Sequence, residues 1–174
     1  MENNVMEPKV KAAVKQVITP AELLNHWQGH RRLTRRTIEA FPEEQLFTYS
    51  VGGMRPFAVM VNEMMGLSAA GIKGIVTGEW ISVKELDYLS GKSAATTKEE
   101  LLAQWDTVTD EIDNCWAQLL PEQFHENILA FNTWEGETYA MVLYWIDNEI
   151  HHRAQGYVYL RSLGIEPPAF WNRA

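Results

Sequence analysis

The chain has 174 residues, a length that suits one domain with one hydrophobic core. Its 15 basic and 23 acidic side chains give a net charge of -8, which disfavours nucleic-acid partners because their phosphates are also negative. A single cysteine, Cys115, excludes an internal disulfide framework and a multi-cysteine metal site. Because there is no signal-peptide pattern and no long uncharged apolar run, we expect a cytoplasmic protein without a membrane partner.

The first helix is predicted from its start and stop signals. Residues 1–18 are expected to be an N-terminal extension that is frayed or holds a short helix, and residues 19–174 to form a single bundle domain. Thr19 and Glu22 match a capping box, with a proline at the first helical position between them. Pro42 cannot continue a helix, so this helix should end near residue 41.

The second predicted helix begins after Pro56 and is the most apolar part of the chain, residues 57–76. It is apolar on nearly all sides, so it should be covered either inside a bundle or at a subunit contact. Residues 77–96 hold glycines and small polar residues and indicate a long crossover, with a short helical turn around residues 83–89.

The third predicted helix has the clearest core stripe. Thr97 and Glu100 match a second capping box, and apolar residues then follow at alternating spacings of four and three from Leu101 to Leu119. This stripe includes Cys115, which we expect to be a small buried hydrophobe rather than a reactive thiol.

The fourth predicted helix covers residues 137–163 and ends with Gly164 at a C-cap position. The FNTWEG segment, residues 131–136, is expected to be a connection because it is rich in turn formers. No convincing run of alternating strand residues occurs. The sequence therefore predicts an all-α four-helix bundle with a long crossover between its second and third helices.

A polar stripe runs along the middle of the fourth helix. Asn148, His152, Gln155 and Tyr159 follow one another at spacings of four, three and four, so they share one helical face. Apolar residues alternate with them, which suggests that the stripe lines the bundle interior. Buried polar groups need partners, and this stripe therefore indicates either a hydrogen-bonded core or a site.

Glu63 on the second helix is a candidate partner for that stripe. Its neighbours on the helix are apolar at nearly every helical offset. A carboxylate in such surroundings must be neutral, paired with a cation or bound to a metal, because an isolated buried charge is costly. From the spacing alone, an ion pair or hydrogen bond with Arg153 or a histidine and a metal or catalytic role both remain open.

Other polar residues have ordinary structural interpretations. Asp147 and His151 are typical of a surface pair four residues apart. His26 and His30 have the same spacing on the first helix, but His30 lies on an apolar stripe and is more typical of a hydrogen-bonded core residue. The basic run 31–36 is expected to be a solvated helix face.

Three segments of the sequence resemble the DinB/YfiT-like four-helix-bundle superfamily. The late segment NEIHHRAQGYVYLRSLGIEPPAFW is similar to the family's fourth-helix motif and its continuation. MRPFAVMVNEMM resembles the second-helix block, and WEGETYAMVLYW resembles the lead into the fourth helix. The resemblance spans roughly residues 20–172 and implies the same bundle fold.

The resemblance also implies a metal site. Members commonly hold zinc or nickel with one histidine from the second helix and two histidines four residues apart on the fourth. In this sequence the matching positions are Glu63, Asn148 and His152, of which only His152 is a histidine. Gln155 or water would complete the coordination shell.

The same resemblance implies a function and an alternative to it. Some members resemble thiol-dependent transferases or isomerases, in which a divalent metal activates a small thiol. Here Asn148 would bind the ion or orient a water molecule, and Arg153 or Tyr159 would position the substrate. The alternative is a metal-free, non-catalytic bundle that acts in ligand binding or association. In either case a homodimer is expected, and a small thiol or other small ligand is the expected binding partner.

Overall fold

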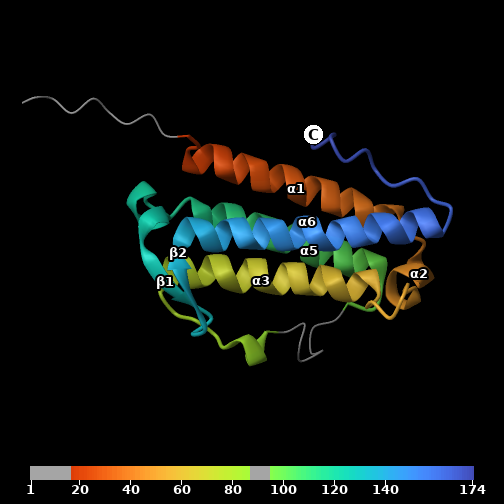
Figure 1. Cartoon of the computed structure of the whole chain (residues 1–174), viewed down its shortest axis with the longest axis horizontal. Coiled ribbons are helices and arrows are strands. Elements are labelled where there is room, and N and C mark those ends of the chain that lie inside the picture. Colours follow the sequence, from red (N-terminus) through yellow and green to blue (C-terminus); the bar gives the residue numbers. More distant parts are fainter. Residues whose placement is uncertain (1–16, 87–94) are drawn as a thin grey trace, which may run out of the picture.

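The computed structural model describes residues 17–86 and 95–174 and shows a helical bundle (Figure 1). Apart from its last two residues, the predicted N-terminal extension lies outside these described residues. The bundle helices α1 and α3 each pack against both α5 and α6, and in Figure 1 α6 lies in front of α5. The helices of the bundle are α1 (Pro20–Ala40), α3 (Phe57–Thr77), α5 (Lys98–Trp116) and α6 (Thr138–Ser162).

The predicted capping boxes form and set the starts of α1 and α5. The Thr19 hydroxyl accepts a hydrogen bond from the Glu22 amide at 3.2 Å, and the Glu22 carboxylate accepts one from the Thr19 amide at 2.8 Å. Thr97 and Glu100 make the same reciprocal contacts. α1 ends before Pro42, as predicted, and a short helix that the sequence did not predict, α2 (Glu43–Thr48), follows it. Six residues are too few to show a helical period.

α3 is a core helix. By length and composition it could cross a membrane, but 56% of its most apolar segment is buried inside the bundle. It contacts α5 and α6 along its length and α2 near its start. The bundle therefore covers much of this helix, which is one of the two ways that the sequence left open. The crossover that follows contains the 3-10 helix η1 (Val83–Glu85), within the predicted helical turn. The rest of that predicted turn, residues 87–89, lies outside the described residues.

A β-hairpin precedes α6, and the prediction that residues 131–136 are only a connection was wrong. β1 (Asn127–Ala130) pairs antiparallel with β2 (Trp134–Glu137). Four-residue strands are too short to show a convincing alternation. Their turn places Phe131 and Asn132 at a φ of 54°, where Phe is unusual. The buried Phe131 ring packs against Trp145, so tertiary contacts hold this turn.

The third predicted helix is shorter than expected. α5 ends at Trp116, and Pro121 begins the 3-10 helix η2 (Pro121–His125). Cys115 packs against the apolar core as its place on the stripe predicted, but it is half-buried, whereas its neighbour Trp116 is buried. A straight helix has 3.6 residues per turn, so a stripe of spacing 3.5 drifts around it and its last positions leave the core.

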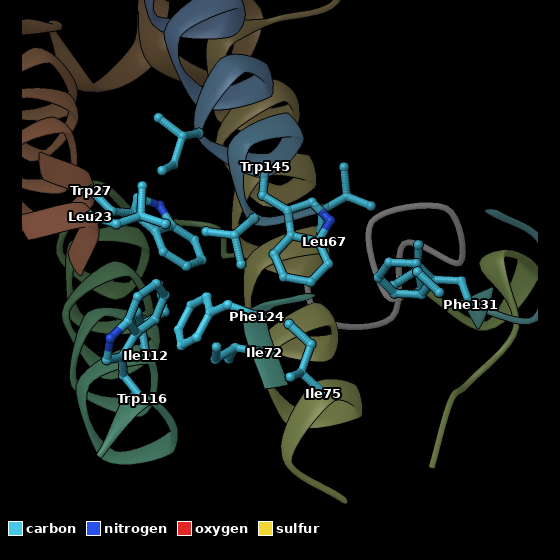
Figure 2. Packing of buried hydrophobic residues seen from close by; sticks show 14 residues of the cluster. Leu23, Trp27, Leu67, Ile72, Ile75, Ile112, Trp116, Phe124, Phe131 and Trp145 are labelled. Atoms are coloured by element: carbon cyan, nitrogen blue, oxygen red, sulfur yellow. The ribbon is translucent and has the colours of Figure 1, made fainter. Parts of the chain in front are cut away.

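α6 has the predicted bounds to within one residue, and Gly164 has the left-handed φ of +77° expected after a helix end. The apolar core consists of two clusters, one toward the hairpin and one toward α2. Figure 2 shows the hairpin-side cluster, in which Trp27, Trp116 and Phe124 pack together. Along α1 and α6, buried polar side chains such as Arg31 and Glu149 lie between the residues of the two clusters.

Candidate metal centre

The structure brings together the three residues that the family resemblance pointed to. Glu63 lies in the second turn of α3, and Asn148 and His152 lie one turn apart on α6, which packs against α3. The Oε1 atom of Glu63 is 3.1 Å from Nε2 of His152 and 3.3 Å from Nδ2 of Asn148. We call Glu63, Asn148 and His152 the central cluster.

Gln155 orients the imidazole ring of His152. The Oε1 atom of Gln155 is 2.7 Å from Nδ1 of the ring, and the Gln155 amide nitrogen donates to the sulfur of Met54. With the Gln155 amide in this orientation, Nδ1 is the protonated nitrogen that donates to Oε1. In the neutral ring the lone pair of Nε2 then faces the Glu63 carboxylate. Two electron-pair donors 3.1 Å apart require a proton or a cation between them.

The Glu63 carboxylate is ionised. Its side chain is only 14% exposed, and Nη2 of Arg55 lies 2.6 Å from its Oε2 atom. With a proton on Nε2, the hydrogen bond that His152 donates lowers the Glu63 pKa from 4.5 to about 2, assisted by Arg55 and opposed by burial. Glu63 is thus paired with a histidine, one of the partners expected from the sequence. The other expected partner, Arg153, bonds elsewhere.

Asn148 leaves one polar atom unsatisfied. Its Nδ2 atom donates to Glu63, but its Oδ1 atom is buried and has no hydrogen-bond partner among residues 17–86 and 95–174. A buried acceptor without a partner loses its hydration energy, about 1–3 kcal/mol. Rotating the amide by half a turn would bring this oxygen to the position of Nδ2, beside Oε1 of Glu63.

The donor set fits a divalent cation with one weak ligand. Zinc binds histidine nitrogen and carboxylate oxygen at about 2.0–2.2 Å, which in a tetrahedral site places neighbouring ligand atoms about 3.3–3.6 Å apart. The two strong donors are 3.1 Å apart, so a small outward shift of either side chain would admit the ion. Gln155 and Arg55 bond the far sides of His152 and Glu63, as outer residues do around protein metals. Within the described residues no three His, Cys, Asp or Glu side chains gather, so Asn148 would be the third protein ligand.

The two predicted catalytic residues bond away from the central cluster. The guanidinium of Arg153 donates to Thr34 at 3.0 Å and to Nδ1 of His30 at 2.8 Å, on the core side of α6. The buried Tyr159 donates its hydroxyl to the backbone carbonyl of Arg55 at 2.9 Å. Tyr159 thereby holds the residue whose side chain contacts Glu63.

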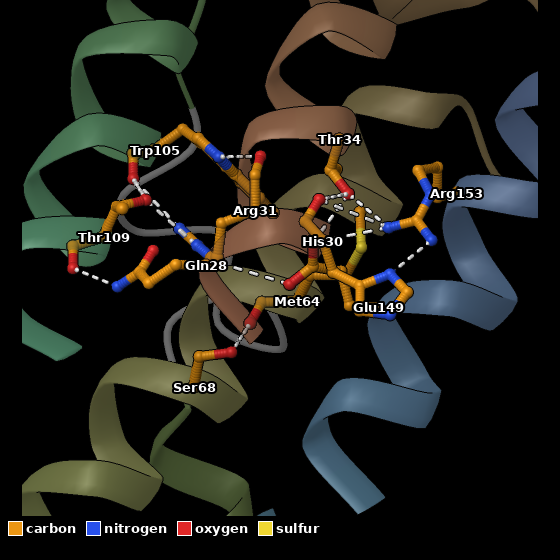
Figure 3. Close-up of polar contacts among 10 residues, drawn as sticks. All are labelled: Gln28, His30, Arg31, Thr34, Met64, Ser68, Trp105, Thr109, Glu149 and Arg153. Atoms are coloured by element: carbon orange, nitrogen blue, oxygen red, sulfur yellow. Dashed lines mark hydrogen bonds and ion pairs between the residues drawn. The ribbon is translucent and has the colours of Figure 1, made fainter. Parts of the chain in front are cut away.

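The structure reveals a buried ion cluster that the sequence analysis missed (Figure 3). Glu149, which is fully buried, accepts a hydrogen bond from Thr34 at 2.6 Å and pairs with Arg31 at 3.8 Å and Arg153 at 3.6 Å. Burial raises the Glu149 pKa, against the pull of both arginines. Glu149 continues the core spacing of Val142 and Ile146, and this periodicity was the signal in the sequence.

The prediction that the whole basic run 31–36 forms a solvated face was wrong at Arg31. Its side chain is fully buried, and its guanidinium stacks 3.5 Å from the centre of the Trp105 ring. It also donates to the Trp105 carbonyl at 2.9 Å and to the Thr109 hydroxyl at 3.0 Å. Successive side chains point in different directions around a helix, so at least one residue of a six-residue run faces the core.

His30 is the hydrogen-bonded core residue that its apolar stripe predicted. It is buried, it accepts a hydrogen bond from Arg153 through Nδ1, and its Nε2 atom is 3.2 Å from Nε2 of His26. Burial, helped by the nearby positive charge of Arg153, lowers its pKa from 6.5 to about 3, so His30 is neutral in the fold.

Comparison with known proteins assigns this bundle to a family. The family model for the DinB family matches residues 6–173. The chain belongs to the DinB family. No curated protein sequence matches it.

Two solved structures support the DinB fold. A DinB-like protein from Bacillus cereus has a TM-score of 0.70 at 13% identity, over 87% of this chain and 97% of that one. A DinB-like protein from Bacillus subtilis has a TM-score of 0.68 at 18% identity, over 87% of this chain and 99% of that one. At these identities the likeness shows the fold.

Proposed function

We propose that the central cluster binds a divalent cation, zinc or nickel, and that this DinB-family protein uses it in thiol-dependent transfer or isomerisation. The supporting observation is the pair of electron-pair donors, Oε1 of Glu63 and Nε2 of His152, which face each other at 3.1 Å. The reaction class comes from the resemblance to DinB/YfiT-like proteins. When bound, such a cation lowers the pKa of a coordinated thiol and supplies the thiolate at neutral pH.

The residues of the chain have distinct roles in this proposal. Glu63 contributes the negative charge, and the neighbouring Arg55 guanidinium favours its ionised form. Gln155 fixes the ring of His152 so that Nε2 points to the site, and Arg55 holds the second oxygen of Glu63. Asn148 contributes its unpartnered oxygen. Water or the thiol completes the shell.

A metal-free role is the second candidate function, and the ion pair between Arg55 and Glu63 favours it. Arg55 already pairs with Glu63 at 2.6 Å, so a proton on Nε2 of His152 would complete an ion cluster without any metal. The cluster would then only fasten α6 to α3. The protein would be a metal-free bundle that binds a ligand or associates with a partner, with no catalytic role for the central cluster.

Metal content separates the two candidates. Protein purified without an affinity tag is incubated with zinc or nickel, passed through gel filtration and analysed for both elements. The variants are Glu63→Gln and His152→Gln, and the matched control is His125→Gln. His125 also faces a carboxylate, that of Glu137 at 3.3 Å, but it is 74% exposed.

We expect about one ion per chain in the parent and the control, and loss of that ion in both cluster variants. Bound metal should also raise the melting temperature of the parent, because a ligand that binds only the folded state stabilises it. Absence of metal from the parent under these conditions would refute the site. If the metal binds, we measure the consumption of a small thiol in the presence of alkyl-halide or epoxide acceptors. No consumption with any of these acceptors would refute the reaction class but not the metal site.

A further inference from the structure

A pocket lies at the surface of α1, where the chain after α6 turns back and runs beside that helix (Figure 1). Nε of Arg32 donates to the backbone carbonyl of Arg173 at 3.0 Å, and Arg36 donates to that of Asn172, so α1 holds the returning chain. The pocket has a volume of about 370 Å³, which suits a small molecule. We call it the α1 pocket, and it is lined by Glu22, Asn25, His26, Gly29, Arg32 and Arg173.

Gly29 allows the returning chain to lie directly against α1. A glycine in the middle of a helix is unfavourable, so its presence there calls for a packing reason. A methyl group at Gly29 would lie 3.3 Å from Cβ of Arg173 and 3.6 Å from its Cδ, which is tight for the first of these contacts. The missing side chain therefore lets Arg173 approach α1 one turn from His26.

A chain of hydrogen bonds determines which nitrogen of His26 carries its proton. Arg153 can only donate, and its Nη2 atom is 2.8 Å from Nδ1 of the buried His30, so that nitrogen is an acceptor. The neutral His30 then has its proton on Nε2, which is 3.2 Å from Nε2 of His26. Burial and the charge of Arg173 lower the His26 pKa, against the pull of Asp147, so this ring is also neutral. Nε2 of His26 accepts, and its proton lies on Nδ1.

Two donors therefore meet in the α1 pocket at a place where an acceptor is needed. Nδ1 of His26 is 3.4 Å from Nη1 of Arg173, and a guanidinium nitrogen cannot accept a hydrogen bond. An oxygen atom that accepts from both groups would satisfy them. The charge of the pocket also favours an anion, because Arg32 and Arg173 contribute two positive charges and Glu22 one negative charge, which leaves +1.

The same contacts argue against a metal between His26 and His30, although their Nε2 atoms face each other. A histidine that binds a metal through Nε2 carries its proton on Nδ1 and donates it to an acceptor. Here an arginine donor lies beside Nδ1 of each ring, Arg153 beside His30 and Arg173 beside His26. The pocket is thus built for an acceptor and not for a cation.

We infer that the α1 pocket binds a small monocarboxylate, whose oxygens accept hydrogen bonds from Nδ1 of His26 and from the Arg173 guanidinium. Arginine and carboxylate form strong, charge-assisted hydrogen bonds. A single negative charge neutralises the pocket, whereas a doubly charged phosphate would leave an excess. The pocket shares no residue with the central cluster, so the inference does not depend on a metal there.

Nitrogen-15 NMR of the histidine rings in the full chain tests the donor argument. At neutral pH we expect the His26 ring to carry its proton on Nδ1 and the His30 ring on Nε2. The variants His26→Gln and His30→Gln assign the two sets of signals. A His26 proton on Nε2 would overturn the inference, because Nδ1 would then accept from Arg173 and no ligand would be needed.

Titration with sodium butyrate at constant ionic strength tests the ligand class, with the Nδ1 signal of His26 as the readout. We expect saturable binding with a dissociation constant of about 1 mM, the range for a ligand of so few atoms. Butyramide has the same size without the charge and should not bind. Arg173→Gln should weaken butyrate binding at least about tenfold, because a charge-assisted hydrogen bond is lost. Arg161→Gln removes one exposed positive charge from α6 and should bind like the parent.

Three outcomes of this titration would overturn the inference. The first is a failure of butyrate to saturate the signal at about ten times the expected dissociation constant. The second is an equal loss of binding in Arg173→Gln and Arg161→Gln, which would indicate general attraction to the charge of the protein. The third is tighter binding of inorganic phosphate than of butyrate, which would assign the pocket to a different anion.

Discussion

Replacing Arg31 with methionine tests the buried ion cluster at the middle of the bundle. Arg31 is fully buried, pairs with Glu149 at 3.8 Å, and stacks on Trp105. Met has a similar length and is apolar, so Arg31→Met removes the charge and the hydrogen bonds while filling much of the volume. Glu149 then keeps Arg153 and Thr34 as partners.

The expected loss follows from these contacts. Two hydrogen bonds from a charged donor contribute about 1.5–3 kcal/mol each, and a desolvated cation on an aromatic ring adds about 2 kcal/mol. The relief from no longer burying a guanidinium offsets part of this sum. Breaking a buried ion pair from one side costs about 3–5 kcal/mol in comparable cases. We therefore expect Arg31→Met to lower the free energy of unfolding by about 3–5 kcal/mol, and the melting temperature by about 6–20 °C for a domain of this size.

The assay is urea unfolding followed by tryptophan fluorescence and circular dichroism, with Arg32→Met as the control. Arg32 is exposed and donates to the backbone carbonyl of Arg173, so its replacement should change stability by less than about 0.5 kcal/mol. A double-mutant cycle of Arg31→Met with Glu149→Gln should give a coupling of at least about 1 kcal/mol. A loss below about 1 kcal/mol for Arg31→Met, or no coupling, would refute the account of the cluster.

Two further predictions concern the core. The fold lowers the pKa of His30 from 6.5 to about 3. Between pH 6.5 and 3 the unfolded chain therefore binds more protons than the folded one, so the free energy of unfolding falls as the pH falls through that window. His30→Gln should therefore lessen the loss of stability on acidification by up to about 1.4 kcal/mol per pH unit, and an unchanged pH profile would contradict this. Gly71→Ala places a methyl group in the space of the buried Trp145 ring, so despite the helix propensity of alanine it should destabilise the protein by about 1–3 kcal/mol in the same unfolding assay. A stabilised Gly71→Ala variant would refute that packing argument.

The candidate site was predictable in part. The spacing of Asn148 and His152 put both on one face of α6, and the apolar neighbours of Glu63 required it to have a partner. That the three residues meet depends on how α3 and α6 pack, which spacing within one helix does not determine. Arg55 could not be predicted as a partner of Glu63, because it precedes α3 in a loop whose path depends on tertiary contacts. Gln155 was predicted on the stripe, but its bond to Nδ1 of His152 required the structure.

The local signals in the sequence determined where the long helices begin and end. Capping boxes, Pro42 and Gly164 act within a few residues, so they can be read without knowledge of the rest of the chain. Tertiary structure alone decided how the buried charged residues are paired. Arg31 lies in a basic run that looks solvated and Glu149 in a segment that looks polar, yet both meet in the core. A charge can be buried only where another helix supplies its partner, and that partner is distant in the sequence.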